Sequence, residues 1–480
     1  MFRIHFTGGG KNQGTNGRPH QIRLYAWLSL GIITLLFVPP NPAYSQTAGQ
    51  CDRTSENRLD EAIRAHNNDS YRKERKFEEV WYYQGSLSEK MTRQISRDTI
   101  SSYLGGLGKR KTAALFHWVH EEKLWTWLMT SSGRMVCATP RALTQEDWKT
   151  LLARNWAVLG ARGARQARAA VPDELGQPDE DQRPQWASLL ARLSEILLPP
   201  EVVAELKSSN SDTLVVVPIT LAIPATYDKP TTLSLSTVPF AALPFENGIV
   251  IDKFSIVIAP GFSSFGKPPK AARQQLRDSF VLGNPVRSPY PDLPGAEDEA
   301  KHVAVRLGTE VFVRESAKKT VLETYLKQHS ASVDLIHLAT HGIANAKDPL
   351  DKSVLVFSDS SWSARQIGAL RLTSKPLVVM SACQTALGKD FQSGTIGLAQ
   401  AWQRAGASNV VMSLWSVDDT ATKELMEHFV DLVASGQAVD KALQTAMISV
   451  RHKYQNPSNW ASFSIYGAPE RIGAVLSPMQ

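Results

Sequence analysis

Two residues at the ends of strand-like apolar runs have the side chains needed for nucleophilic catalysis. The run "VDLIHLATHG" (333–342) contains His341 near its end, and "KPLVVMSACQTALG" (375–388) places Cys383 directly after its apolar part. A free thiol has a pKa of about 8.5, so an imidazole that accepts its proton makes the reactive thiolate available near neutral pH. The two residues could therefore form a thiol–imidazole dyad if their strands lie side by side.

Attack of a thiolate on a carbonyl group creates an oxyanion, which needs preorganised hydrogen-bond donors worth roughly 3 kcal/mol each. The backbone N–H groups of Gly342 and Cys383 are the expected donors. Gly342 has no Cβ, so a substrate backbone can approach it closely. A lone cysteine in apolar surroundings is otherwise most often a small core residue, so the hypothesis depends on the pairing with His341.

The elements around these residues alternate between strands and helices. Alternation of this kind predicts a mostly parallel sheet, and the carboxyl ends of its strands are where chemistry is expected. Gly406 is expected to close one of the helices as a C-terminal cap. The predicted strands are 279–285, 333–342, 376–383 and 409–415, and the predicted helices are 295–308, 361–372, 394–406 and 418–435.

The first half of the chain has a less regular pattern. Residues 46–100 are polar and charge-rich with helical patches, and 112–138 reads as strands joined by short turns. A helix is predicted over 186–206, followed by a buried strand at 213–220, whose apolar run is continuous. The sequence contains no solenoid repeat.

Six runs of this sequence follow one another in order over about residues 110–470. They are "VPFAALPF" (238–245), "LPGAEDEA" (293–300), "HLATHG" (337–342), "LVVMSACQTALG" (377–388), "GLAQAWQRAGASNVVMSLWSVDDTATKELMEHF" (397–429) and "NWASFSIYGAP" (459–469). Together these runs resemble the CHAT domain, a caspase-fold cysteine peptidase family of clan CD that is related to separases.

The resemblance implies an α/β fold with a caspase-like, mostly parallel sheet flanked by helices. It implies two lobes, a degenerate N-terminal lobe over 101–270 and a catalytic lobe over 271–472, preceded by a helical extension over 46–100. Caspase-type peptidases place the histidine roughly 50 residues before the cysteine, and His341 precedes Cys383 by 42 residues. The implied activity is peptide-bond hydrolysis by this dyad.

Three functions stay open at this point. The leading hypothesis is a cysteine endopeptidase that acts on a protein or peptide and is latent until a protein partner, cleavage or an ion activates it. The chain lacks the tetratricopeptide array of many relatives, which leaves the mode of activation open. The alternatives are a non-catalytic peptide-binding module of the same fold, and a thiol acyltransferase or amidase that uses the same dyad.

Asp418 and Asp419 follow the predicted strand 409–415 and open a helix. Their simpler interpretation is helix capping, with Ser416 and Asp419 arranged like a capping box. Resemblance to separase-like peptidases allows a second one, in which a carboxylate receives a basic P1 side chain of the substrate. The sequence is compatible with either role.

Other histidines do not form a convincing metal site. His337 and His341 lie on one strand about 13 Å apart, so His337 is predicted to be structural, packed or hydrogen-bonded beneath the site. His117 and His120 would point to opposite faces of a strand. "GGLGKR" (105–110) lacks the hydroxyl and the upstream glycine of a phosphate loop. We expect no metal, cofactor or nucleotide.

The N-terminus explains most of the excess positive charge. The 480 residues carry a net charge of +7, and residues 1–45 contribute four basic side chains and no acidic ones, which leaves +3. The apolar run at 24–38, followed by a small-x-small site at 43–45, predicts a signal peptide over 1–45. The protein is then periplasmic or secreted without a membrane span, or membrane-anchored if the segment is not cleaved. Nucleic acid is not an expected partner.

Of the three cysteines, Cys51 and Cys137 are expected to form a disulfide, since export permits one. Cys383 would then be the free thiol.

Overall fold

The computed structural model describes most of the chain after residue 50. The described residues are 51–65, 95–107, 111–152, 185–218, 221–222, 232–233, 235–259, 261, 265, 276–345, 348–382, 389–391, 394–415 and 417–467. The predicted signal peptide, Cys383 and Ser416 lie outside these residues.

A single large sheet of twelve strands runs through the described part of the chain. Its neighbouring strands are parallel in seven pairs and antiparallel in four, so the sheet is mostly parallel, as predicted. The order is β12 (Val311–Val313), β11 (Ser279–Gly283), β13 (Leu335–Ala339), β17 (Leu377–Ser381), β20 (Asn409–Ser413), β21 (Phe463–Gly467), β10 (Ser255–Ile258), β5 (Thr213–Pro218), β1 (Thr112–His120), β2 (Lys123–Thr130) and β3 (Met135–Cys137), with β4 (Arg141–Ala142) paired to β2.

The central strands of the second half are buried along their whole length. All five residues of β13, of β17 and of β20 are buried, which explains their continuous apolar runs. The first half joins this sheet through the parallel pairing of β10 with β21. The sheet therefore continues from one half of the sequence into the other.

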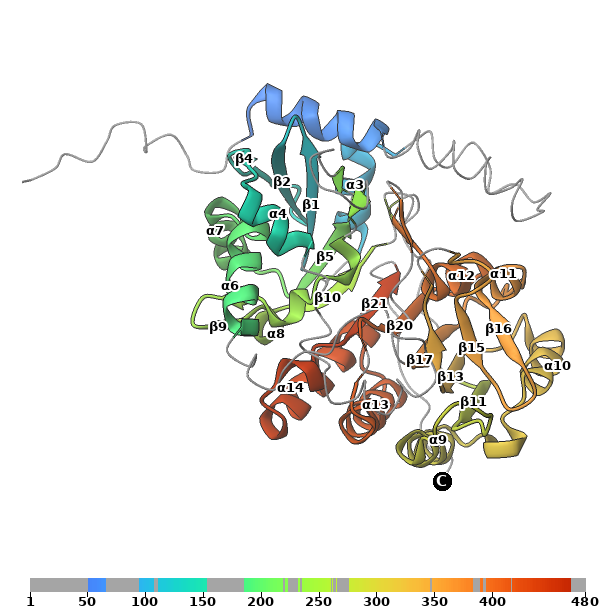
Figure 1. Cartoon of the computed structure of the whole chain (residues 1–480). Coiled ribbons are helices and arrows are strands. Elements are labelled where there is room, and N and C mark those ends of the chain that lie inside the picture. Colours follow the sequence, from blue (N-terminus) through green and yellow to red (C-terminus); the bar gives the residue numbers. More distant parts are fainter. Residues whose placement is uncertain are drawn as a thin grey trace, which may run out of the picture. The chain divides into compact units, whose positions relative to one another are not determined.

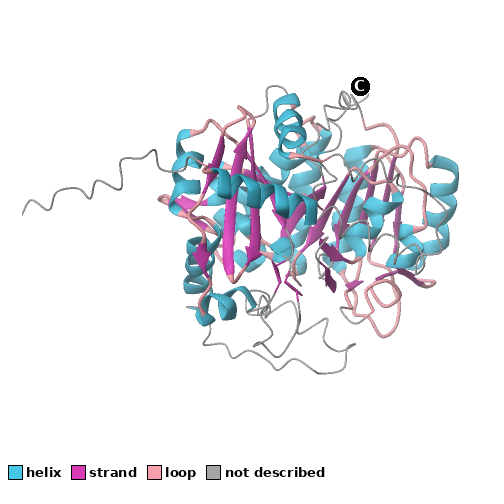
Figure 2. Ribbon diagram, turned by 90° about the horizontal axis from the view of Figure 1, so that it is seen from above, coloured by secondary structure: helices cyan, strands magenta, loops and turns pink. Residues whose placement is uncertain are grey.

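Helices cover these strands on both faces (Figures 1 and 2). α9 (Pro294–Leu307) packs against β11, β13 and α13 (Asp419–Ala434), and α14 (Val439–Lys453) packs against β10 and α13. α12 (Leu398–Ala405) packs on β20 from the other side, next to α11 (Ala364–Gly368) (Figure 1). The remaining described helices are the segment 53–65, α3 (Arg97–Gly106), α4 (Gln145–Leu152), α6 (Gln185–Leu197), α7 (Pro200–Ser208), α8 (Val250–Lys253) and α10 (Lys319–His329).

Three predicted helices differ from the observed ones. The helix expected over 186–206 is two helices, because Pro199 and Pro200 cannot continue α6 and instead begin α7. Residues 361–363 form β16 (Ser361–Ser363), and the helix starts only after Ser363 accepts a hydrogen bond from the N–H of Gln366. Residues 394–396 form β19 (Gly394–Ile396) before α12 begins. Gly406 ends α12 with a φ of 118°, a conformation that glycine adopts readily, as predicted.

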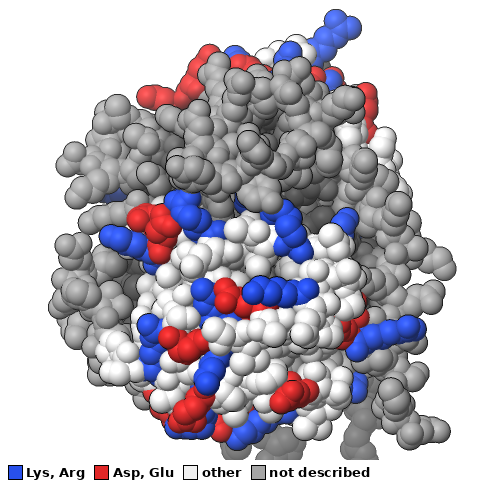
Figure 3. All heavy atoms as spheres, turned by 90° about the vertical axis from the view of Figure 1, so that its right-hand side faces the viewer, with Lys and Arg blue, Asp and Glu red and all other residues white. Residues whose placement is uncertain are grey.

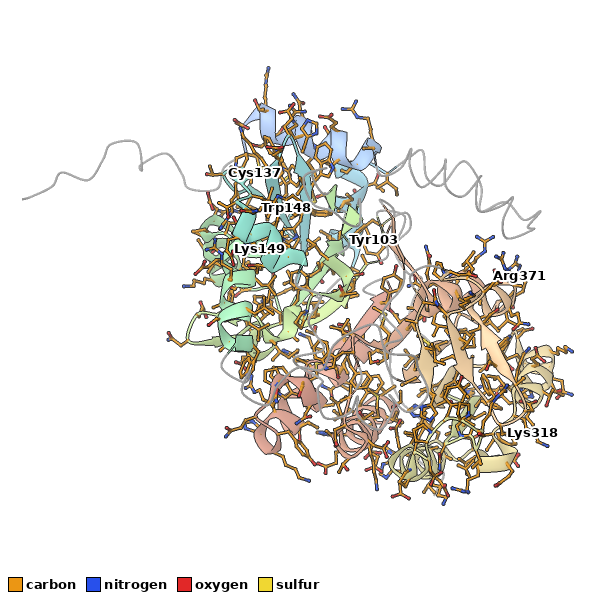
Figure 4. The ribbon with its side chains drawn as sticks, viewed as in Figure 1. Tyr103, Cys137, Trp148, Lys149, Lys318 and Arg371 are labelled. Atoms are coloured by element: carbon orange, nitrogen blue, oxygen red, sulfur yellow. A yellow bond between two sulfur atoms is a disulfide. The ribbon has the colours of Figure 1, made fainter. Side chains whose placement is uncertain are left out.

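The predicted disulfide is present. Cys51 and Cys137 are bonded with an S–S distance of 2.00 Å and a Cα–Cα distance of 5.0 Å. The bond connects the start of the helical segment 53–65 to β3, where Figure 4 labels Cys137. Cys383 is the one cysteine of the sequence outside this bond.

The surface charges are mixed on the face shown in Figure 3, where described basic and acidic side chains alternate. This mixture gives no further support to nucleic-acid binding at that face. Within the described ranges, no helix combines the length and the apolar character that crossing a membrane requires.

Candidate active site

β13 and β17 run parallel and side by side, and their last residues, Ala339 and Ser381, are paired. The N–H of Thr340 donates to the carbonyl of Ser381 at 3.2 Å, which extends the pairing by one residue. In the sequence, His341 follows Ala339 by two positions and Cys383 follows Ser381 by two positions. The structure therefore shows the adjacent strands that the dyad requires. The position of Cys383 itself lies outside the described residues, so the dyad stays a prediction.

His341 is held in one orientation by the loop that precedes α9. Its side chain is buried, with 6% of the residue surface exposed. Its Nε2 atom lies 2.8 Å from the carbonyl oxygen of Pro291, and its ring lies 5.4 Å from that of Tyr290, centroid to centroid. A carbonyl oxygen only accepts hydrogen bonds, so Nε2 carries the proton and Nδ1 is left as an acceptor. A neutral histidine in this form can act as a base through Nδ1.

The surroundings of His341 favour this neutral form. Burial lowers the pKa of His341 below its usual 6.5, because the charged imidazolium loses hydration. The Pro291 carbonyl and the negative charge of Asp419 act against burial and raise the pKa. The net shift is downward, so the imidazole of His341 is neutral at pH 7.

Asp419 connects two helices beside His341. Its Oδ2 atom accepts a hydrogen bond from the N–H of Gly295 at 2.7 Å, at the first turn of α9. A Cβ atom at position 295 would lie 2.5 Å from the same oxygen, so this approach requires glycine. Burial raises the pKa of Asp419, and the charge of Asp418 raises it further, while the N–H groups of Gly295 and Ala296 lower it.

Asp418 caps α13. Its Oδ1 atom accepts hydrogen bonds from the N–H groups of Thr420 and Ala421, both at 3.0 Å. The predicted capping role is therefore confirmed for Asp418, which is the N-cap of α13. The predicted part of Ser416 lies outside the described residues. The prediction that Asp418 or Asp419 receives a basic substrate side chain stays a prediction.

A buried polar network lies beneath the strand ends. Nε2 of His337 is 2.7 Å from Oε1 of Glu299, and the hydroxyl of Ser381 donates to Oε2 of Glu299 at 3.0 Å. His337 is fully buried and hydrogen-bonded, as predicted. Sequence analysis did not single out Glu299. The signal was available, because Glu299 lies between Ala296 and Val303 on the buried face of an amphipathic helix.

The other residues considered in the sequence analysis lie in ordinary structural positions. Gly342 begins β14 (Gly342–Ile343) and pairs with Leu355 of β15 (Val354–Val356), and its oxyanion role stays a prediction. His117 is buried and bonded to the carbonyl of Leu197, whereas His120 contacts Arg58. Among the described residues, no group of three or more His, Cys, Asp or Glu side chains is arranged to hold a metal ion.

Comparison with known proteins places this chain in a family. The family model of the CHAT domain matches residues 187–468. Tetratricopeptide repeat protein 28 of Mus musculus is 26% identical over 296 residues, which are 50% of this chain and 12% of that protein. The protein of the same name from Homo sapiens is 26% identical over 299 residues, with coverages of 51% and 12%. The chain thus corresponds to a small part of these relatives.

A solved structure shares the fold. The Saccharomyces cerevisiae separase–securin complex matches with a TM-score of 0.50 and 11% sequence identity, covering 79% of this chain and 31% of that chain. At this identity the likeness concerns the fold alone, which is a caspase-like, mostly parallel α/β arrangement. Since the matched family model covers more than half of the sequence, the chain belongs to the CHAT domain family.

Proposed function

We propose that this chain is an exported cysteine endopeptidase in which Cys383 is the nucleophile and His341 is its base. The observation that carries the proposal is the pairing of Ala339 with Ser381, because each candidate residue follows one of these paired strand ends by two positions. The caspase-like fold and the neutral, oriented imidazole of His341 support it.

The proposed reaction uses the free nitrogen of His341. Nδ1 takes the proton of the Cys383 thiol, and the thiolate attacks the peptide carbonyl carbon. The backbone N–H groups of Gly342 and Cys383 stabilise the resulting oxyanion. The C–N bond then breaks as His341 returns the proton to the leaving amine. Water hydrolyses the remaining thioester and restores the thiol.

A preference for a basic P1 residue is a separate part of the proposal. Asp419 is the better candidate to receive that side chain, because it is half-buried and its charge acts on His341. Asp418 is exposed and already accepts two hydrogen bonds as a helix cap. A fluorogenic peptide panel tests this preference. Equal cleavage after Arg, Lys and neutral residues would contradict the proposed P1 preference. It would not contradict the dyad.

The proposal also includes export of the protein and a latent activity that a protein partner switches on. The Cys51–Cys137 bond supports an oxidising compartment, periplasmic or extracellular, because such bonds are rare in reducing ones. Mass spectrometry of the N-terminus of the protein from its native host tests the predicted cleavage near residue 45. An activating protein partner is also proposed, and the matched separase structure is itself a complex with securin.

The decisive experiment labels the thiol with a cysteine-reactive peptide probe, since a latent enzyme can be labelled before it turns over substrate. Cys383 is the single cysteine outside the disulfide, so labelling reports on it alone. We expect labelling of the wild type, none in Cys383→Ala, and a large loss in His341→Ala. His452→Ala, at an exposed histidine of α14, is the matched control and should label normally.

The same experiment separates the alternatives. Labelling that is independent of His341 would contradict the dyad and favour a non-catalytic peptide-binding module. Labelling that depends on His341, followed by acyl transfer or release of ammonia rather than peptide cleavage, would identify a thiol acyltransferase or amidase. Circular dichroism of each variant confirms that the fold is retained.

A further inference from the structure

We propose that Glu299 is a positioning residue that holds β13 and β17 in the alignment needed by the residues following their ends. Its catalytic consequence rests on the proposed dyad of His341 and Cys383. The arrangement itself rests on hydrogen bonds between described residues, and it involves a side chain outside the dyad.

Glu299 contacts both strands from one helix. Its Oε1 atom is 2.7 Å from Nε2 of His337 in β13, and its Oε2 atom accepts from the hydroxyl of Ser381 in β17 at 3.0 Å. His337 is paired with Val379, two residues before Ser381, so both partners lie on the face of the sheet that α9 covers. One carboxylate thus links the two strands independently of their backbone ladder.

The directions of these bonds are determined by their surroundings. Among the described residues, Nδ1 of His337 has no hydrogen-bond partner, which favours the form with the proton on Nε2. That proton is donated to Glu299, and the Ser381 hydroxyl donates to the other oxygen. Glu299 therefore accepts one directional bond from each strand.

A carboxylate is a costly choice for this position. Only 1% of the surface of Glu299 is exposed, and burial raises its pKa although His337 and Ser381 act in the opposite direction. An apolar side chain of similar size would fill the space without this desolvation cost. Two directional hydrogen bonds select one alignment of helix and strands, which apolar contacts specify less sharply.

The start of the same helix and the loop before it also contact His341 and Asp419. The loop before α9 supplies the Pro291 carbonyl, and the first turn of α9 supplies the Gly295 N–H to Asp419. Glu299 follows Gly295 by four residues, which is about one helical turn or 6 Å. A shift of α9 against the strands would therefore move the groups that orient His341 away from the residue following β17.

The test measures the rate of Cys383 alkylation by iodoacetamide as a function of pH, which requires no substrate. Glu299→Met removes both hydrogen bonds while filling the space, and Glu299→Gln can keep both because its amide accepts and donates. We expect at least a tenfold slower alkylation at pH 7 for Glu299→Met, with a profile that approaches that of a free thiol. Glu299→Gln should stay within about 1.5-fold of the wild type.

Two further variants make the result decisive. Glu205→Gln is the matched control, because Glu205 is a buried glutamate of α7 that pairs with Arg134, and its change should leave alkylation unaltered. Ser381→Ala removes only the hydrogen bond between Glu299 and β17, and should slow alkylation by about threefold. If Glu299→Met does not fold, this variant tests the positioning role of Glu299 instead.

The outcomes distinguish this proposal from the proposed function. In one outcome, alkylation of wild-type Cys383 depends on His341, but Glu299→Met is alkylated at the wild-type rate. The positioning role of Glu299 is then wrong and the dyad is unaffected. If Glu299→Met does not fold, a wild-type rate in Ser381→Ala leads to the same conclusion. If Glu299→Gln loses as much as Glu299→Met, hydrogen-bond positioning is likewise overturned. If the wild type already behaves as a free thiol and is insensitive to His341→Ala, both proposals fail.

Discussion

The Nε2 atom of His341 lies 2.8 Å from the carbonyl oxygen of Pro291, a residue 50 positions earlier in the chain. This contact determines which ring nitrogen carries the proton and leaves Nδ1 as the acceptor. Burial then keeps the ring neutral over most of the physiological range by lowering its pKa. In the proposed dyad, the pH dependence of Cys383 chemistry would follow from these two features.

Asp419→Asn should move the acidic limb of Cys383 alkylation, or of peptide cleavage, to lower pH. The charge of Asp419 raises the pKa of His341, so its removal lowers that pKa and keeps the base neutral in more acidic solution. The measurement is the rate between pH 4 and pH 8. Asp418→Asn is the matched control, because it makes the same charge change at the neighbouring residue and asparagine also caps helices. If the acidic limb of the pH–rate profile is unchanged in Asp419→Asn, the interaction between the charge of Asp419 and His341 is contradicted.

Asp418→Ala should destabilise the protein by about 1 kcal/mol, since two N–H groups at the start of α13 lose their acceptor. Asp418→Ser should lose only a small part of this, because serine is also a favoured N-cap. The free energy of unfolding in urea measures both. Equal losses in the two variants would show that the charge, rather than the hydrogen bond, is what stabilises the helix.

The buried His117 should make the protein sensitive to mild acid. Burial lowers the pKa of His117 from 6.5 to about 4, although the hydrogen bond to the Leu197 carbonyl raises it. In the unfolded chain His117 therefore binds a proton near pH 6.5, whereas in the folded protein it stays neutral until about pH 4. The free energy of unfolding consequently falls as the pH drops from about 6.5 to about 4. The loss approaches about 3 kcal/mol at the lower end.

His117→Gln should flatten this dependence, because glutamine can donate to the Leu197 carbonyl without titrating. Unfolding in urea at pH 7, pH 5.5 and pH 4.5 provides the comparison. The exposed His452→Gln variant should keep the slope of the wild type. If the free energy of unfolding of His117→Gln depends on pH as steeply as that of the wild type, groups other than His117 account for the acid sensitivity.

Reductant should have two opposite effects. Opening the Cys51–Cys137 bond, which spans 86 residues, should cost about 2–4 kcal/mol of stability and lower the melting temperature. Keeping Cys383 reduced should raise the proposed activity, since a thiol of lowered pKa is readily oxidised in an oxidising compartment. The double variant Cys51→Ser/Cys137→Ser should start at the lower melting temperature and not respond to reductant in stability. If reductant leaves labelling of Cys383 unchanged in both proteins, its proposed reactivity is contradicted.

Local patterns in the sequence were sufficient for much of the fold. Continuous apolar runs predicted β13, β17 and β20, and amphipathic spacing predicted α9 and α13 close to their observed limits. The exceptions have local causes as well. Two consecutive prolines divide the helix predicted over 186–206, and strand pairing with β15 takes 361–363 out of the following helix.

The contacts that build the candidate site are not local. Glu299 meets Ser381 across 82 residues of sequence, and Gly295 meets Asp419 across 124. The sequence alone determined the residue types, the strands that precede His341 and Cys383 along the chain, and the family resemblance. Only the tertiary structure decided which carbonyl orients His341 and why a glutamate is buried in α9. Hydrogen bonds are directional and short-ranged, so such partners become definite only when packing has brought distant segments together.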